Sequence, residues 1–300
     1  MIRWAGKQEG LNHSYWKRMW ELVYPWLIYE GVMMLVSFVF GLFLMVFRPG
    51  LFADAEGVYK TSVILNQQMT SHYALLALII CLLTIPLLLF FWKRDRKTEV
   101  QESFQMEEWQ KTGALSFLLC FCLGVSACII LNHVLIYSGL YELLSQGFEE
   151  PAQTLYQGKL LPELLSIGIL TPMVEELIFR GLVYRRIRWY LNAVPAMVFS
   201  ALLFAVFHGN LLQGIYAFAL GLLLAFVYER THSVLAPVCI HVGANLISVL
   251  MTDIPSFGRI YKAQNEGAFL LFTAVMMLVF TAAFYFFYTR VQPARLDREV

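Results

Sequence analysis

Eight long apolar segments constrain what this 300-residue chain can fold into more than any other feature of its sequence. A helix that crosses a bilayer needs about 20 mostly apolar residues, because the hydrocarbon core is about 30 Å thick. Segments that meet or approach this length occupy residues 22–47, 72–92, 113–137, 161–184, 192–209, 211–228, 233–252 and 268–289. The sequence therefore predicts an all-α fold, a polytopic membrane helical bundle with about eight transmembrane helices.

The composition agrees with a membrane protein. The chain is 59% hydrophobic and only 14% charged, whereas a soluble domain carries about 25% charged residues. We see no low-complexity tract, soluble domain or internal repeat, so residues 1–300 are predicted to form a single integral membrane domain. A net charge of +1 gives no indication of a nucleic-acid partner, and the five cysteines all lie in apolar segments, where they are expected to be small buried hydrophobes.

Basic residues predict the orientation of the bundle. If the N-terminus is inside, sixteen Lys and Arg residues lie in inner segments. Only five lie in outer loops, namely Arg48, Lys60, Lys159, Arg259 and Lys262. Under the positive-inside rule this bias predicts that both termini are cytoplasmic. It also supports an even number of spans, and Trp16–Trp20 is expected to be an interfacial anchor before the first one.

The fourth segment carries three charged groups, Glu175, Glu176 and Arg180, in otherwise apolar surroundings. Ionisable groups inside a membrane are costly, rare and usually functional. Glu176 and Arg180 stand at positions i and i+4 and share a helix face, so we expect an ion pair between them. Glu175 is rotated by about 100° and is predicted to face a polar cavity. A purely structural clasp between helices would explain the pair but leaves Glu175 without a partner.

Two later segments add further polar groups. His208 ends the aromatic run Phe204–Phe207, and His241 and Asn245 share a face at positions i and i+4. Prolines precede two of these sites, Pro172 before Glu175 and Pro237 before His241, where they can bend a helix beside a cavity. His208 falls near the outer end of the fifth segment. For it to meet Glu175, this segment must tilt or end early, or one predicted boundary is wrong.

Three known ways of hydrolysing a peptide bond inside a membrane can be checked against these residues, and none fits. The sequence contains no His-Glu-x-x-His motif and no Gly-x-Ser-x-Gly motif. Asp253 has no second intramembrane aspartate, so a two-aspartate mechanism fails as well. Glu30 and His133 also lie in apolar segments, near their ends, and are expected to be structural or interfacial. One carboxylate, two imidazoles and an amide remain.

These residues resemble a known family. Glu175-Glu176-x-x-x-Arg180, Phe204-x-x-x-His208 and His241-x-x-x-Asn245, in this order on three helices, are similar to the motifs of the CPBP (CAAX protease and bacteriocin-processing, or Abi) intramembrane proteases. This family includes the type II CAAX prenyl endopeptidase. The resemblance covers about residues 160–250, as a protease core on the fourth, fifth and seventh helices.

The resemblance implies an enzyme, a glutamate-dependent or metal-dependent endopeptidase, and a role for each residue. Glu175 would be the general base, His208 would help to hold the attacking water, and His241 and Asn245 would stabilise the oxyanion. Glu176 and Arg180 would support the site. Such families have been labelled metalloproteases, and Glu175, His208 and His241 could hold a zinc ion. We favour a glutamate-activated water without a metal or other cofactor.

The resemblance also implies a substrate class and a location. The expected partners are the lipid bilayer and a hydrophobic or lipidated peptide, and the expected location is a bacterial cell membrane. Two other functions stay open. A non-catalytic membrane scaffold or regulator could share the fold, and a transporter could use the same polar groups as a substrate site, although the sequence has no evident inverted repeat.

Overall fold

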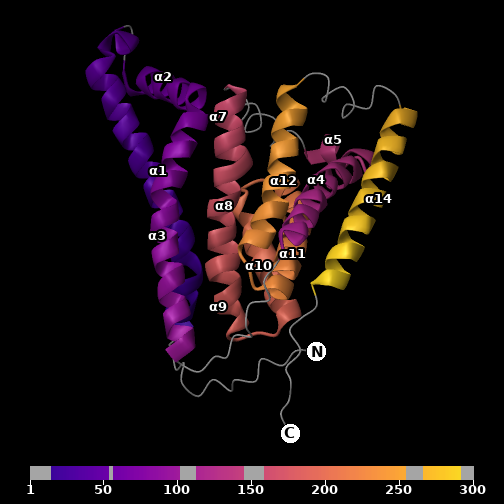
Figure 1. Cartoon of the computed structure of the whole chain (residues 1–300). Helices are drawn as coiled ribbons and strands as arrows, with labels where there is room; N and C mark the ends of the chain where they lie inside the picture. Colours follow the sequence, from indigo (N-terminus) through magenta and orange to yellow (C-terminus); the bar gives the residue numbers. More distant parts are fainter. Residues whose placement is uncertain (1–14, 54–56, 102–112, 145–158, 255–265, 292–300) are drawn as a thin grey trace.

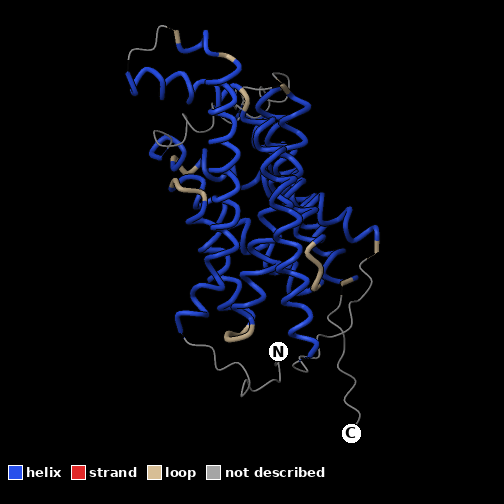
Figure 2. The backbone as a smooth tube through the Cα atoms, turned by 90° about the vertical axis from the view of Figure 1, so that its left-hand side faces the viewer, coloured by secondary structure: helices blue, strands red, loops and turns tan. Residues whose placement is uncertain are grey.

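The computed structural model describes residues 15–53, 57–101, 113–144, 159–254 and 266–291, and every regular element within these ranges is a helix (Figure 1). Figure 2 shows, from the side, that most of these helices stand upright in one bundle. The predicted all-α helical bundle is confirmed.

Six helices are long and apolar enough to cross a membrane in the part of the chain that the structure describes. They correspond to six of the eight predicted segments, and their outer surfaces carry many exposed apolar side chains. They are α1 (Tyr15–Phe47), α3 (Tyr73–Gln101), α4 (Ala114–Tyr137), α11 (Leu211–Thr231), α12 (Leu235–Asp253) and α14 (Glu266–Arg290). The fourth and fifth predicted segments take other forms.

The fourth segment is a rod of changing helical geometry. Figure 1 shows its pieces stacked end to end in the middle of the bundle. The α-helical pieces alternate with two π-helical stretches, in which each carbonyl is bonded to the N–H five residues later. In order along the chain the pieces are α7 (Leu160–Leu165), the π-helical η3 (Ser166–Leu170), α8 (Thr171–Glu176), the π-helical η4 (Leu177–Tyr184) and α9 (Arg185–Arg188). We call residues 160–188 the central rod.

The fifth segment is too short to span a membrane. It forms α10 (Ala193–Phe207), whose 15 residues are about 22 Å long, less than the roughly 30 Å of a hydrocarbon core. His208 follows directly as its C-cap. Gly209 then adopts a positive φ of 72°, which turns the chain sharply, and Asn210 caps α11 by accepting a hydrogen bond from the N–H of Gln213 at 2.9 Å. α10 thus ends within two residues of the predicted boundary at residue 209, and His208 stands directly after its last turn.

Three short or amphipathic elements complete the described part. They are η1 (Pro49–Phe52), α2 (Gly57–Ser71) and α5 (Leu140–Leu144). In Figure 1, α2 lies across one end of the bundle beside the tops of α1 and α3. α2 is not among the predicted segments, because its apolar residues are interspersed with polar ones.

Buried and half-buried ion pairs join the helix ends at the opposite end of the bundle. Arg186 of α9 contacts Asp95 of α3 at 2.7 Å, and Arg188 contacts Glu229 of α11 at 2.8 Å. Arg230 in turn donates to a main-chain carbonyl just beyond α14 at 2.7 Å. The structure therefore gathers at one end the described basic residues that the sequence assigned to the inner side. Five other basic residues assigned to the inner side lie outside the described residues, namely Arg3, Lys7, Lys111, Arg295 and Arg298, as do both termini. The outer-loop residues Arg259 and Lys262 lie outside them as well.

Glycines bring α12 close to α4. A Cβ atom on Gly243 would lie 2.6 Å from the carbonyl oxygen of Phe121, and one on Gly124 would collide with the main chain of Ile240. Small residues are the usual means by which membrane helices approach each other. Since Ile240 and Gly243 flank His241, this contact fixes where α12 presents its polar groups.

Candidate active site

The two glutamates lie in the middle of the central rod. Glu175 and Glu176 end the short α-helical piece α8, between the two π-helical stretches. Single π-helical turns widen a helix and occur often at functional sites. The side chain of Glu176 is fully buried, whereas that of Glu175 is 12% exposed. Glu175 is thus the more exposed of the two carboxylates.

Glu176 forms the predicted ion pair. Its Oε1 atom lies 2.9 Å from Nη1 of Arg180, and both side chains are completely buried. Arg180 also donates from Nη2 to the carbonyl of Gly221 at 3.0 Å and stacks over the ring of Phe204, 4.7 Å from its centre. A Cβ atom at position 221 would approach Nη2 to 3.3 Å, so glycine leaves room for the guanidinium. The charge is therefore compensated by a carboxylate, a carbonyl and an aromatic face.

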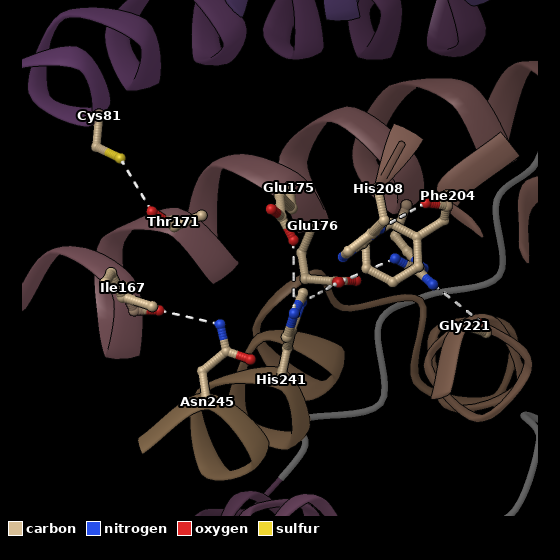
Figure 3. Close-up of polar contacts among 11 residues, drawn as sticks. Cys81, Ile167, Thr171, Glu175, Glu176, Phe204, His208, Gly221, His241 and Asn245 are labelled. Atoms are coloured by element: carbon tan, nitrogen blue, oxygen red, sulfur yellow. Dashed lines mark hydrogen bonds and ion pairs between the residues drawn. The ribbon is translucent and has the colours of Figure 1, made fainter. Parts of the chain in front are cut away.

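His241 extends this pair to the second glutamate. Its Nδ1 atom lies 2.8 Å from Oε1 of Glu176, and its Nε2 atom lies 3.5 Å from Oε2 of Glu175. Arg180, Glu176, His241 and Glu175 thus form one chain of contacts, drawn in Figure 3. Because an ionised carboxylate only accepts hydrogen bonds, Nδ1 of His241 carries a hydrogen, and Nε2 is the nitrogen that faces Glu175. Sequence spacing paired Glu176 with Arg180 alone and did not indicate this second partner.

Asn245 lies one turn further along α12 and contacts the same rod. Its amide nitrogen donates to the carbonyl of Ile167 at 3.0 Å. His241 and Asn245 therefore share the face that their spacing predicted, and both point toward the central rod (Figure 3).

His208 joins the group through an aromatic side chain. Its Nδ1 atom bonds to the carbonyl of Phe204 in its own helix at 2.8 Å. The ring of Phe204 contacts the ring of His208 at 4.7 Å and that of His241 at 5.6 Å, both edge to face. Figure 3 shows His208 beside Phe204, on the side of the glutamates. The structure thus brings all six predicted residues to one region. Four of them, Arg180, Glu176, His241 and Glu175, are linked by direct polar contacts. His208 is joined to them by the ring of Phe204 and Asn245 by the carbonyl of Ile167.

Three further residues contact the site without a role that the sequence indicates, namely Phe204, Gly221 and Ile167. Phe204 was visible as the partner of His208 at i and i+4, a spacing that places both on one face. Its third contact, the stacked guanidinium of Arg180, comes from another helix, so no pattern within one segment could indicate it. Gly221 and Ile167 contribute main-chain carbonyls. Because every residue has such a carbonyl, the sequence does not indicate that these two take part in the site.

The other intramembrane polar residues have structural contacts, as expected. Glu30 accepts a hydrogen bond from the indole N–H of Trp26 at 3.0 Å within α1. His133 is buried between α4 and α14, 2.5 Å from the hydroxyl of Thr273 and stacked against Phe269.

The described residues do not form a ready metal site. No group of three or more His, Cys, Asp or Glu side chains within them is arranged to hold a metal ion. Of the alternative zinc ligands Glu175, His208 and His241, the last has both ring nitrogens directed at carboxylates. This arrangement differs from a zinc site, in which one ring nitrogen binds the metal.

Comparisons with known proteins agree with the motifs. Residues 157–247 match the family described as "Type II CAAX prenyl endopeptidase Rce1-like". A protein of Bacillus subtilis (strain 168) named "Putative membrane peptidase YdiL" is 30% identical over 84 residues, which are 28% of this chain and 34% of the relative. The match therefore spans about a third of that relative's length. No solved structure matches the chain.

The matched segment contains Glu175, Glu176, Arg180, His208, His241 and Asn245. The resemblance inferred from the three motifs is thus confirmed by an independent comparison. Over residues 157–247 this chain is therefore similar to the type II CAAX prenyl endopeptidase Rce1-like family.

Proposed function

We propose that the protein is an intramembrane endopeptidase of the CPBP type, which hydrolyses a peptide bond in a hydrophobic or lipidated peptide. One observation carries this proposal. The slightly exposed carboxylate of Glu175 faces Nε2 of His241, and the Nδ1 atom of the same ring contacts the fully buried Glu176–Arg180 ion pair. All four residues lie in the segment that matches a peptidase family.

In the proposed reaction Glu175 takes a proton from a water molecule, and the oxygen of that water attacks the peptide carbonyl. The proton then passes to the leaving amine, so that water and peptide give an acid and an amine. His208 helps to hold the water, since the bond of its Nδ1 atom to the carbonyl of Phe204 leaves Nε2 to do so. The 3.5 Å separation between Glu175 and Nε2 of His241 supports proton exchange between the base and the ring.

His241 and Asn245 stabilise the negative oxygen that develops during the attack. Glu176 fixes the His241 ring by accepting from Nδ1, so that Nε2, when it carries a hydrogen, donates in a set direction. With His241 doubly protonated, the charges of Arg180, Glu176, His241 and Glu175 alternate in sign and sum to zero. A buried group that is neutral as a whole is easier to desolvate than one with a net charge.

We propose that this reaction needs no metal ion. The support is that Nδ1 of His241 contacts Glu176 and Nε2 contacts Glu175. The ring would have to move away from one of these carboxylates before it could bind zinc. A zinc-dependent reaction through Glu175, His208 and His241 is the competing mechanism.

The proposed location is a bacterial cell membrane with both termini cytoplasmic. Six apolar helices support an integral membrane protein, and the clustering of basic side chains at one end of the bundle supports the orientation. The similarity to a Bacillus subtilis protein supports the bacterial setting. For the substrate, the site's position among apolar helices supports a peptide that is itself held in the membrane.

The test is cleavage of a panel of prenylated and unmodified hydrophobic peptides by purified protein, with and without a chelator. The wild type should produce new fragments, and Glu175→Gln should lower the rate about 10²–10⁴-fold, the usual contribution of a general base. Glu30→Gln is the matched control, since Glu30 also lies in an apolar helix but contacts Trp26. It should cleave like the wild type.

Each alternative makes a different prediction in the same experiment. A scaffold gives no fragments, and its cellular effect survives Glu175→Gln. A transporter gives substrate flux across vesicles without cleavage. Loss of activity on chelation, restored by zinc, would refute the metal-free mechanism.

A further inference from the structure

The carbonyl of Ile167 receives no hydrogen bond in either of the patterns that its own helix offers. In an α-helix it would accept from the N–H of Thr171, and in a π-helix from the N–H of residue 172. Thr171 instead donates to the carbonyl of Ser166, and Pro172 has no N–H. Ile167 is buried, and a buried carbonyl without a donor is costly.

Asn245 supplies the donor from another helix. Its amide nitrogen lies 3.0 Å from this carbonyl. Because a carbonyl only accepts, the nitrogen and not the oxygen of the amide must face Ile167, and this determines which way the side chain is turned. Figure 3 shows the nitrogen directed at Ile167 and the amide oxygen turned away from it. The amide nitrogen has two hydrogens, so one stays available for another acceptor.

We propose that Pro172 is a positioning residue for Asn245. In a π-helical turn the N–H of residue 172 would donate to the Ile167 carbonyl, and proline has no N–H. The carbonyl therefore stays available to accept a hydrogen bond from the Asn245 amide. This hydrogen bond is an anchor, which holds the second N–H in a set direction before substrate arrives. This inference rests on the proposed function, in which that N–H donates to the developing oxyanion, and a donor that is held in place in advance is more effective than a mobile one.

The first test measures stability and needs no activity. Asn245→Ala should lower the thermal unfolding temperature, because it leaves the Ile167 carbonyl without its donor. In a Pro172→Ala background the new N–H can satisfy this carbonyl, so the loss caused by Asn245→Ala should shrink by about half or more. Pro86→Ala is the matched control, since Pro86 lies inside the membrane-spanning helix α3. In that background Asn245→Ala should cost as much as in the wild type.

An undiminished loss in the Pro172→Ala background would overturn the inference. Pro172→Gly, which also restores an N–H, takes the place of Pro172→Ala if the latter does not fold.

The second test measures catalysis with a peptide that the wild type cleaves. Pro172→Ala should lower kcat about 10-fold, less than the 10²–10³-fold typical of removing an oxyanion donor outright. KM should not change, because the amide is proposed to act in the transition state. Combining Pro172→Ala with Asn245→Ala should lower kcat no further than Asn245→Ala alone, while Pro86→Ala should have no effect.

The two tests separate the two proposals. If the wild type cleaves no peptide, the proposed function fails, and the stability measurement still decides whether Pro172 controls the anchor. If the stability measurement shows the coupling but Pro172→Ala leaves kcat unchanged, the positioning role in catalysis is wrong.

Discussion

At the scale of single residues, the main feature of this protein is a chain of four ionisable side chains in an apolar interior. Arg180, Glu176 and His241 are almost completely buried, and Glu175 at the end of the chain is 12% exposed. Glu176 contacts Arg180 on one side and His241 on the other, and His241 contacts both glutamates. The two glutamates therefore have different environments although they are neighbours in sequence, and only Glu175 stands at the accessible end.

We expect Arg180→Ala to destabilise the protein by about 3–5 kcal/mol, because it leaves the buried Glu176 carboxylate without its cation. Thermal unfolding in detergent, followed by tryptophan fluorescence, measures the effect. The matched control is Arg290→Ala, which removes an exposed arginine at the end of α14 and should change stability by no more than about 0.5 kcal/mol.

Glu175→Gln provides the complementary measurement. It should leave the unfolding temperature near that of the wild type, since Glu175 is the most exposed of the four side chains and glutamine has almost the same shape. If Arg180→Ala left stability intact and Glu175→Gln unfolded the protein, our assignment of the supporting and the catalytic glutamate would be reversed.

At the scale of elements, two irregular helices and one close helix contact build the site. The central rod changes between α- and π-helical geometry on both sides of the glutamates, and α10 ends after 15 residues, so that His208 stops inside the bundle. On the other side α12 packs against α4 through Gly124 and Gly243. The polar groups of three elements converge because none of these elements is an undisturbed spanning helix at a normal distance from its neighbours.

Gly243→Ala tests the close contact. The new methyl group would lie 2.6 Å from the Phe121 carbonyl oxygen, so α12 must move away from α4, at a cost of about 1–3 kcal/mol. Because His241 and Asn245 lie on α12, peptide cleavage should fall together with the unfolding temperature.

Gly31→Ala is the control for this change. Gly31 lies in α1 and has nothing within 4 Å of its virtual Cβ. Alanine there should be neutral or raise stability by up to about 1 kcal/mol, in keeping with its higher helix propensity, and should leave cleavage unchanged. Equal effects of the two substitutions would contradict the proposed role of the contact.

At the scale of the whole molecule, the bundle has two different ends. One end joins α1, α3, α9, α11 and α14 through arginine contacts, and the other carries α2 (Figure 1). A helical bundle with apolar outer surfaces and one basic end is expected to orient itself in a membrane with that end in the cytoplasm.

Cysteine labelling tests this orientation in whole cells. In a cysteine-free background, Lys60→Cys in α2 should react with a membrane-impermeant maleimide added outside, because α2 lies at the less basic end. Lys93→Cys near the end of α3 should react only after the membrane is permeabilised. The opposite pattern would invert the topology, and labelling of both sites from outside would contradict a single orientation.

Local rules were enough for the part of this fold that depends on one segment at a time. Length and hydropathy located the six helices that are long enough to span a membrane, since a span must be long and apolar whatever surrounds it. The i, i+4 spacing predicted the Glu176–Arg180 pair and the shared face of His241 and Asn245, because 3.6 residues per turn fixes which side chains are neighbours on a helix. The order of three motifs identified the family.

The contacts between different helices were decided by the tertiary structure alone. It placed His241 against both glutamates, stacked Arg180 on Phe204 and turned Asn245 toward the Ile167 carbonyl. Each of these contacts depends on the distance and rotation of two helices, which follow from side-chain packing along their whole length. It also introduced π-helical turns in the central rod, because a helix inside the bundle can give up regular hydrogen bonds only where a neighbouring helix supplies the missing donor.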